Sequence, residues 1–169
     1  MKKSLLGKTN MEITRIGLGL AEVFRQQTKI SDQESSHFLN SVVDQNARLN
    51  LFEKAQSQNM GIIIKRPVAN GAWQAKSLPS QYATQYFERA KIMDSIGPID
   101  SAYENPIDLT LAFVLSHKAV TTAIVGTHNL DHLKSNIELS NSDFDLNKET
   151  LQEIYSRFKE HKNDWVQLM

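Results

Sequence analysis

Two segments of this 169-residue chain combine residue types that could bind an anionic ligand. Lys65-Arg66 directly follows the apolar run 62–64, and Gly126-Thr127 precedes a predicted helix that begins near Asn129. Unpaired N–H groups at a helix N-terminus attract phosphate, which makes the second segment a candidate phosphate site. Each segment also has a simpler interpretation. Lys65 and Arg66 could be solvent-exposed charges at the end of a buried strand. Residues 127–136 could be an ordinary capped helix.

Other residue types narrow the possible chemistry. The chain has no Cys, which excludes a disulfide framework, a thiolate zinc site and thiol catalysis. No metal-ligand spacing relates carboxylates to the histidines His37, His117, His128 and His161. We assign no catalytic role to the tyrosines, which are Tyr82, Tyr86, Tyr103 and Tyr155. Trp73 and Trp165 are interpreted as packing residues.

Charge and hydropathy suggest a single cytoplasmic domain over residues 1–169. The 19 Lys and Arg balance the 19 Asp and Glu, so no overall field favours nucleic acid or an anionic membrane. The apolar run near the N-terminus is too short for a secretory signal, and nothing approaches the roughly 18–20 apolar residues of a membrane helix. We therefore expect neither a nucleic-acid nor a membrane partner.

The predicted elements alternate between strands and helices. Residues 4–6 and 13–20 indicate an N-terminal hairpin that leads into a core strand. The β-branched runs 62–64 and 121–125 are typical of strands buried on both faces. Helices are expected over 80–94, from Asn105-Pro106 onward, over 129–137 and over 147–161. This order predicts an α/β fold.

A break in that alternation lies between residues 31 and 59. The sequence Ser-Asp-Gln-Glu at 31–34 has the form of a capping box, and the apolar positions Phe38, Leu39, Val42 and Val43 recur at helical spacing. A second helix is expected over 47–59. Because no clear strand separates these two predicted helices, we expect that an element is missing here. The predicted helix at 107–115 has a broad apolar surface. We expect the chain to lack the neighbouring helices that would bury this surface.

Three stretches, in order along the chain, resemble the aldo-keto reductase family. The first, 6–19, is similar to the hairpin and first barrel strand of that family. The second, 61–73, is similar to its seventh strand and following loop. The third, 111–136, resembles its last strand and the helix after it.

The resemblance implies an incomplete barrel. Residues 1–42 resemble the family's start, with hairpin, first strand and first helix, and residues 43–169 resemble the end of its sixth strand and everything after it. Strands two to five have no counterpart. A (β/α)8 TIM barrel typically needs about 250 residues, with a lower limit near 200, so we expect a partial barrel with its middle strands missing.

The resemblance also implies a chemistry, NADP-dependent carbonyl or aldehyde reduction, together with the loss of its catalytic residues. The family uses a Tyr as general acid, a Lys and an Asp that adjust the pKa of that Tyr, and a His that orients the carbonyl. All four lie on the missing strands or their loops, and no residue here matches them. We therefore expect the chain as written to lack reductase activity.

The cofactor-binding residues that the resemblance implies are retained. By position, Gly126 and Thr127 would contact the adenosine phosphates of NADP and Asn136 would lie near its adenine. His132 stands where the family often has an Arg for the 2′-phosphate. Lys65 stands where many members stack an aromatic ring on the nicotinamide. Arg66, Pro67 and Val68, in the loop that follows the strand at 62–64, complete the cofactor-binding residues that the resemblance implies.

Three hypotheses follow. The chain is an internally deleted, inactive family member, or a non-catalytic nucleotide-binding or interaction module, or a portion of a longer, active reductase. Because three barrel strands cannot close on themselves, we expect unpaired strands to drive homo-oligomerisation.

Overall fold

The computed structural model describes residues 1–19, 35–143 and 146–168. Its first elements, β1 (Lys3–Leu5) and β2 (Glu12–Thr14), form the expected antiparallel hairpin. Gly7 has a φ of 53°, and a Cβ there would lie 2.2 Å from the backbone nitrogen of Gly61. Only glycine fits so close an approach at that φ, so Gly7 holds the hairpin turn against the start of strand β5 (Gly61–Lys65).

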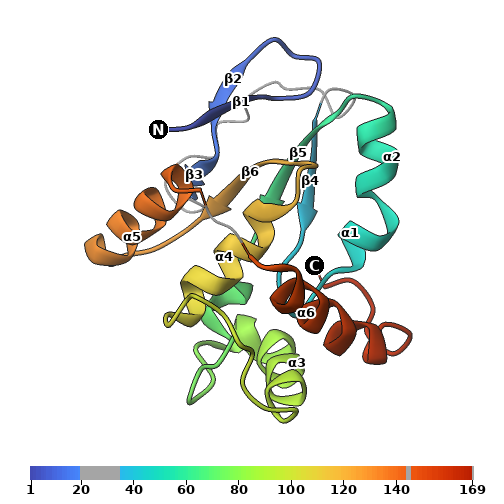
Figure 1. Ribbon diagram of the computed structural model, residues 1–169, viewed down its shortest axis with the longest axis vertical. Coiled ribbons are helices and arrows are strands. Elements are labelled where there is room, and N and C mark those ends of the chain that lie inside the picture. Colours follow the sequence, from blue (N-terminus) through green and yellow to red (C-terminus); the bar gives the residue numbers. More distant parts are fainter. Residues whose placement is uncertain (20–34, 144–145, 169) are drawn as a thin grey trace.

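A four-stranded parallel sheet forms the centre of the molecule (Figure 1). Beside β5 it contains β3 (Ile16–Leu18), β4 (Ser35–Leu39) and β6 (Val120–Val125). The spatial order is β3-β6-β5-β4, and all three neighbouring pairs are parallel. This confirms the predicted α/β class and the strands expected at 62–64 and 121–125.

Strand β4 corrects the sequence interpretation of this region. Residues 31–34 lie outside the described part of the chain, but 35–39 pair with β5 over five positions and are not helical. Val42 and Val43 are fully buried in a tight turn closed by backbone hydrogen bonds between Ser41 and Asp44. The helical spacing of the apolar residues is therefore coincidental, because pairing with β5 determines the conformation. Among the described residues the sheet has four strands, where the sequence indicated three.

The helices agree more closely with expectation. Those between the strands are α1 (Asn46–Asn50), α2 (Phe52–Ser57), α3 (Thr84–Asp94) and α4 (Pro106–Ser116). After β6 come α5 (Leu130–Asn141) and α6 (Lys148–His161). The asparagine side chains of Asn105, Asn129 and Asn147 each accept backbone N–H groups at the start of a helix, as N-cap residues do.

Helix α4 is the centre of the hydrophobic core. Residues 109–115 are all buried, and the apolar ones form one cluster with Ile62 and Ile64 of β5 and Ala123 and Val125 of β6. Full burial of each large apolar side chain contributes about 1.5–3 kcal/mol. The expectation that residues 107–115 would lack a cover is therefore wrong, since β6 and α5 both pack on α4.

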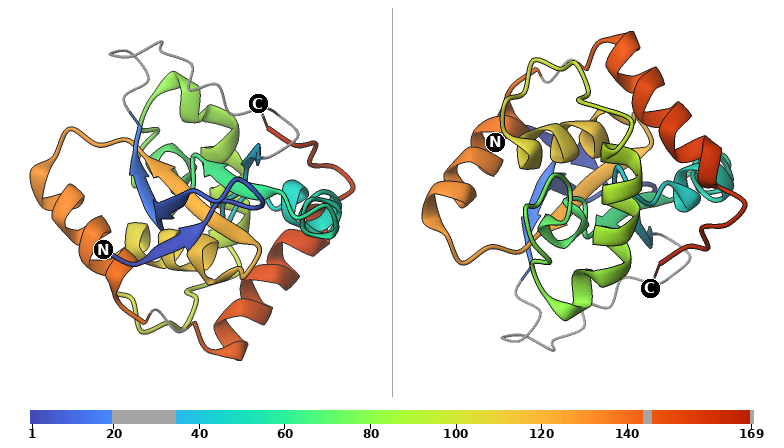
Figure 2. Two further views of the ribbon diagram at one scale, coloured as in Figure 1. Left: turned by 90° about the horizontal axis from the view of Figure 1, so that it is seen from above. Right: turned by 90° about the horizontal axis from the view of Figure 1, so that it is seen from below.

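Four of the other helices lie at opposite ends of the sheet. Figures 1 and 2 place α5 beside β3, with α1, α2 and α6 at the other end, beyond β4 and β5. Contacts of α5 with β3 and of α2 with β5 agree with the views.

Candidate functional site

The sequence-predicted cofactor residues lie at the carboxyl ends of neighbouring strands. The register places Lys65 of β5 opposite Ile124 of β6, so Lys65 is close to the point where the chain leaves the sheet at Gly126. On the other side of β6, the backbone N–H of Gly19 donates to the carbonyl of Val125 at 2.9 Å. In parallel α/β sheets this edge is where ligands bind, because the loops that follow the strands gather there.

The segment after β5 has an unusual backbone. Lys65 is exposed, Arg66 and Val68 are partly exposed, and Pro67 is buried. Five of the nine residues 66–74 have positive φ. Four of them are not glycine, namely Arg66, Ala69, Asn70 and Gln74, and the fifth is Gly71. Such conformations cost on the order of 1 kcal/mol or more per non-glycine residue, so surrounding contacts must hold this loop in place.

The segment after β6 contains an ordinary helix cap. The Asn129 side chain accepts the backbone N–H groups of Asp131 at 2.8 Å and His132 at 3.4 Å. Thr127 Oγ1 in turn accepts the N–H of Asn129 at 3.1 Å. A phosphate at this helix start would have to share or replace the Asn129 contacts. His132 itself is exposed.

Among the predicted site residues, Asn136 has a buried hydrogen-bond acceptor that is not paired within the described part of the chain. It lies in the second turn of α5 and its side chain is 3% exposed. Its Oδ1 atom is buried and has no hydrogen-bond partner among the described residues. A buried acceptor left without a donor costs about 1–3 kcal/mol, so the site favours a ligand that brings an N–H group.

Two buried polar residues, Asn40 and Ser41, were missed by the sequence analysis. They follow β4 directly, and both polar atoms of the Asn40 side chain and the Ser41 hydroxyl lack partners in the part of the chain described here. Each residue is 1% exposed. Their position at a strand end would have identified them, but that strand had been interpreted as a helix.

A buried polar cluster lies beside them and includes the phenol of Tyr86. Burial raises the pKa of Tyr86, and the nearby guanidinium groups of Arg66 and Arg89 lower it less than burial raises it. Tyr86 is only 2% exposed. A phenol that is both harder to ionise and closed off from solvent is a poor proton donor to a substrate.

Metal and membrane chemistry receive no support from the described residues. Within 1–19, 35–143 and 146–168, no three His, Asp or Glu side chains cluster in a way that could hold a metal ion. In the same ranges no helix has both the length and the apolar character needed to cross a membrane.

Comparison with solved structures shows the same fold in two aldo-keto reductases. The holo form of an aldo-keto reductase from Bacillus halodurans is 23% identical with a TM-score of 0.58, and the similarity covers 73% of this chain and 42% of that one. An aldo-keto reductase from Klebsiella pneumoniae, solved in complex with NADPH, is 18% identical with a TM-score of 0.55 and covers 76% and 41% respectively. The chain thus spans about two fifths of the length of these relatives.

Sequence comparison identifies the family directly. No curated protein matches the chain. The sequence profile of the aldo/keto reductase family matches residues 40–157, which is more than half of the chain and includes β5, α4, β6 and α5. On this match the chain belongs to the aldo/keto reductase family.

Proposed function

We propose that this chain is the part of an aldo/keto reductase barrel that receives the adenosine end of NADP, and that it does not reduce carbonyl compounds by itself. In this proposal β3, β4, β5 and β6 take the places of the first, sixth, seventh and eighth barrel strands. The observed order β3-β6-β5-β4 supports this, because removing strands two to five from a closed eight-stranded barrel leaves that order.

The observation that carries the proposal is the orphaned Oδ1 atom of Asn136. The exocyclic amino group of adenine is an N–H donor that would satisfy it, so the residues present fit the adenine end of the cofactor. Gly126, Thr127 and His132 would lie along the phosphates, with Lys65, Arg66, Pro67 and Val68 on the neighbouring strand end. The reduced form, NADPH, would be the hydride donor; these residues would only bind and orient it.

Asn136→Leu is expected to weaken NADPH binding by about 5- to 100-fold, which corresponds to one lost buried hydrogen bond. Leu has nearly the shape of Asn, so the free protein is expected to keep its stability or gain some. Calorimetric titration with NADPH and thermal melting of the unliganded variant measure the two effects.

The control for this experiment is Lys134→Gln, an exposed change on the same helix. A structural role for Asn136 would give the opposite pattern, with a lower melting temperature and unchanged affinity. Submicromolar binding that survives Thr127→Ala combined with Asn136→Ala would place the cofactor elsewhere.

We further propose that the chain associates with a second copy through its outer strands. Within the described residues, β3 and β4 each have a sheet neighbour on one side only. Such edges are templates for pairing with another chain. Two copies with β3 of each beside β4 of the other would supply eight parallel strands, the number that a closed barrel of this type requires.

Leu18→Pro is expected to convert a dimer into a monomer. The N–H groups of β3 alternate in direction, and the N–H of Gly19 is bonded to β6, so that of Leu18 faces the outer edge. Light scattering over a concentration series should give twice the mass of one chain for the parent and for Leu18→Thr, and the mass of one chain for Leu18→Pro. A parent mass of one chain at every concentration would rule the association out.

A further inference from the structure

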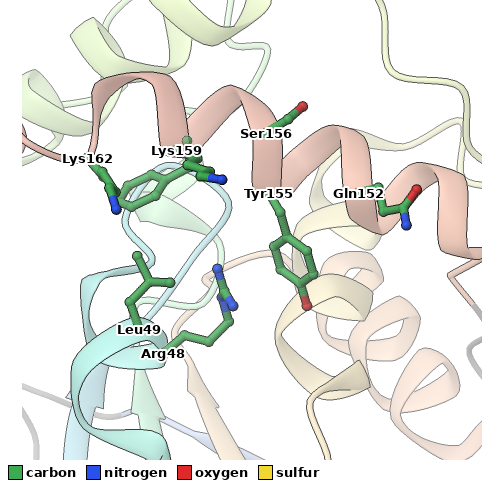
Figure 3. Close-up of a pocket in the computed structure, with 8 residues that line it drawn as sticks. Arg48, Leu49, Gln152, Tyr155, Ser156, Lys159 and Lys162 are labelled. Carbon is green, nitrogen blue, oxygen red and sulfur yellow. The ribbon is translucent and has the colours of Figure 1, made fainter.

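A pocket lies between α1 and α6, at the other end of the sheet from the predicted cofactor residues on α5. Its volume is about 350 Å³, within the range of small-molecule sites in proteins. Arg48 and Leu49 come from α1, while Tyr155, Phe158, Lys159 and Lys162 come from α6 and the residue that follows it (Figure 3). Nothing in the proposed cofactor function uses these residues.

The pocket has an apolar interior. Leu49 is exposed and Tyr155 is partly buried, and both present apolar surface to the opening, while Phe158, which also borders the pocket, is fully buried. The Tyr155 hydroxyl lies 3.3 Å from Nε2 of His117, which leaves the tyrosine ring as its contribution to the pocket. Burial lowers the pKa of His117 to about 4, so this neighbour is uncharged at neutral pH.

The charges at the pocket have one sign. Arg48, Lys159 and Lys162 line it, and no acidic side chain does. None of these three cations forms an ion pair with any residue in the described ranges. Figure 3 shows Arg48 reaching up from α1 toward Tyr155, while Lys159 and Lys162 lie along the opposite wall.

Arg48 is held in place before any ligand arrives. Its guanidinium lies over the Tyr155 ring at 4.1 Å, and one terminal nitrogen donates to Oε1 of Gln45 at 3.1 Å. Gln45 is fixed in turn by donating to the carbonyls of Val42 and Ile154. The Nε–H of Arg48 is buried and has no acceptor among the residues described. The contact with Gln45 uses one of the five N–H donors of this guanidinium, and a carboxylate pairs with a guanidinium through charge-assisted hydrogen bonds.

We propose that this pocket binds a small carboxylic acid with an apolar body. The carboxylate would pair with Arg48, and the body would lie on Leu49 and Tyr155. Lys159 and Lys162, which are exposed at the rim, add attraction for the anion. This site is independent of the proposed NADP function, because it lies on α1 and α6 and not on α5.

Two probes test the proposal, octanoate for an aliphatic acid and 2-naphthoate for an aromatic one. Each is titrated into the full chain by calorimetry beside its neutral counterpart, octanol or 2-naphthalenemethanol. We expect at least one acid to bind at least 10-fold more tightly than its counterpart, with affinity that falls as salt rises. If the site prefers an aromatic body, Tyr155→Leu should lower the affinity for 2-naphthoate more than the affinity for octanoate.

Substitutions of Arg48, Lys159 and Lys162 then test whether these cations bind the carboxylic acid. Arg48→Met should weaken acid binding by about 10- to 100-fold, the effect of losing a charge-assisted hydrogen bond. Because Arg48 also packs on Tyr155, the exposed pair Lys159→Gln with Lys162→Gln provides a variant that leaves the core intact, with about 3- to 10-fold weaker binding expected. Lys148→Gln on the same helix lies outside the pocket and should change nothing.

Three results would overturn the proposal. Neither acid binds, or the neutral compounds bind as tightly as the acids, or the paired lysine variant binds the acids with unchanged affinity and unchanged salt dependence.

Discussion

Replacing Asp44 with Ala is expected to lower the free energy of unfolding by about 3–5 kcal/mol, because it leaves a buried cation without an anion. Asp44 is fully buried and Arg89 is 7% exposed, with 3.9 Å between Oδ1 of Asp44 and Nη1 of Arg89. The carboxylate also accepts the backbone N–H of Leu168 at 2.8 Å and the side-chain amide of Asn46 at 3.1 Å. Arg89 donates to the carbonyl of Val166. Asp44 thus joins three distant segments of the chain.

Burying the charged pair of Asp44 and Arg89 costs free energy, and a double variant that removes both charges tests this cost. Burial raises the pKa of Asp44 and lowers that of Arg89, and both directions disfavour the charged forms. Asp44→Leu combined with Arg89→Met should therefore be less destabilising than Asp44→Ala alone. Glu12→Ala, which removes the exposed partner of Lys3, should change stability by less than about 1 kcal/mol.

Urea unfolding at pH 7 measures all four proteins. If Asp44→Ala costs under about 1 kcal/mol, or if the double variant is the least stable of the set, Asp44 does not hold these segments together as described.

With NADPH and a reactive aromatic aldehyde, the chain is expected to show no saturable turnover. Reduction by this family needs a phenol whose pKa is lowered by a cation inside an accessible site. Among the described tyrosines, Tyr86 is closed off from solvent, and burial raises the pKa of both Tyr86 and Tyr155. Losing the acid catalyst alone removes a factor of about 10²–10⁴ in rate, so only trace reduction should remain.

A matched comparison uses the parent, Tyr86→Phe and Tyr155→Phe under one set of conditions, with a full-length family member as the active standard. All three should give the same trace rate. Turnover that saturates with aldehyde and disappears in either Phe variant would identify a proton donor and refute the proposal that the chain is inactive by itself.

The parts of the fold that follow from local physics could be predicted from the sequence. The run at 62–64 is three β-branched residues, which favour a strand wherever they are buried. Asn105, Asn129 and Asn147 mark helix starts because an N-cap needs only its own side chain and the next two or three amides. No tertiary contact is required for either inference.

Strand β4 was not predictable in this way. Its sequence, Ser-Ser-His-Phe-Leu, contains no β-branched residue, and its extended form depends on pairing with β5, more than twenty residues later. Once that strand was misread, the polar residues at its end, Asn40 and Ser41, had no reason to be considered.

The candidate sites also combine features that the sequence indicates with features that only the tertiary contacts reveal. The resemblance placed Asn136 near the adenine from its position alone, but only the fold shows that its Oδ1 atom is buried and unmatched. The pocket between α1 and α6 brings together Arg48 and Tyr155, which are about a hundred residues apart and unremarkable in type. No sequence pattern relates them, because their contact depends on the packing of two helices.

The position of β3 in the sheet determines when this chain can finish folding on a ribosome. In the part of the chain described, its sheet partner is β6, and Ile16 pairs with Ala123, about a hundred residues later. At roughly 5–20 residues per second, β3 must wait on the order of 5–20 s before β6 has been synthesised. Closing a loop of that length costs about 4 kcal/mol in chain entropy by the logarithmic scaling of loop closure. The first strand of the four-stranded sheet to leave the ribosome is therefore the last to find its partner, and until then the nascent chain must keep β3 from pairing elsewhere.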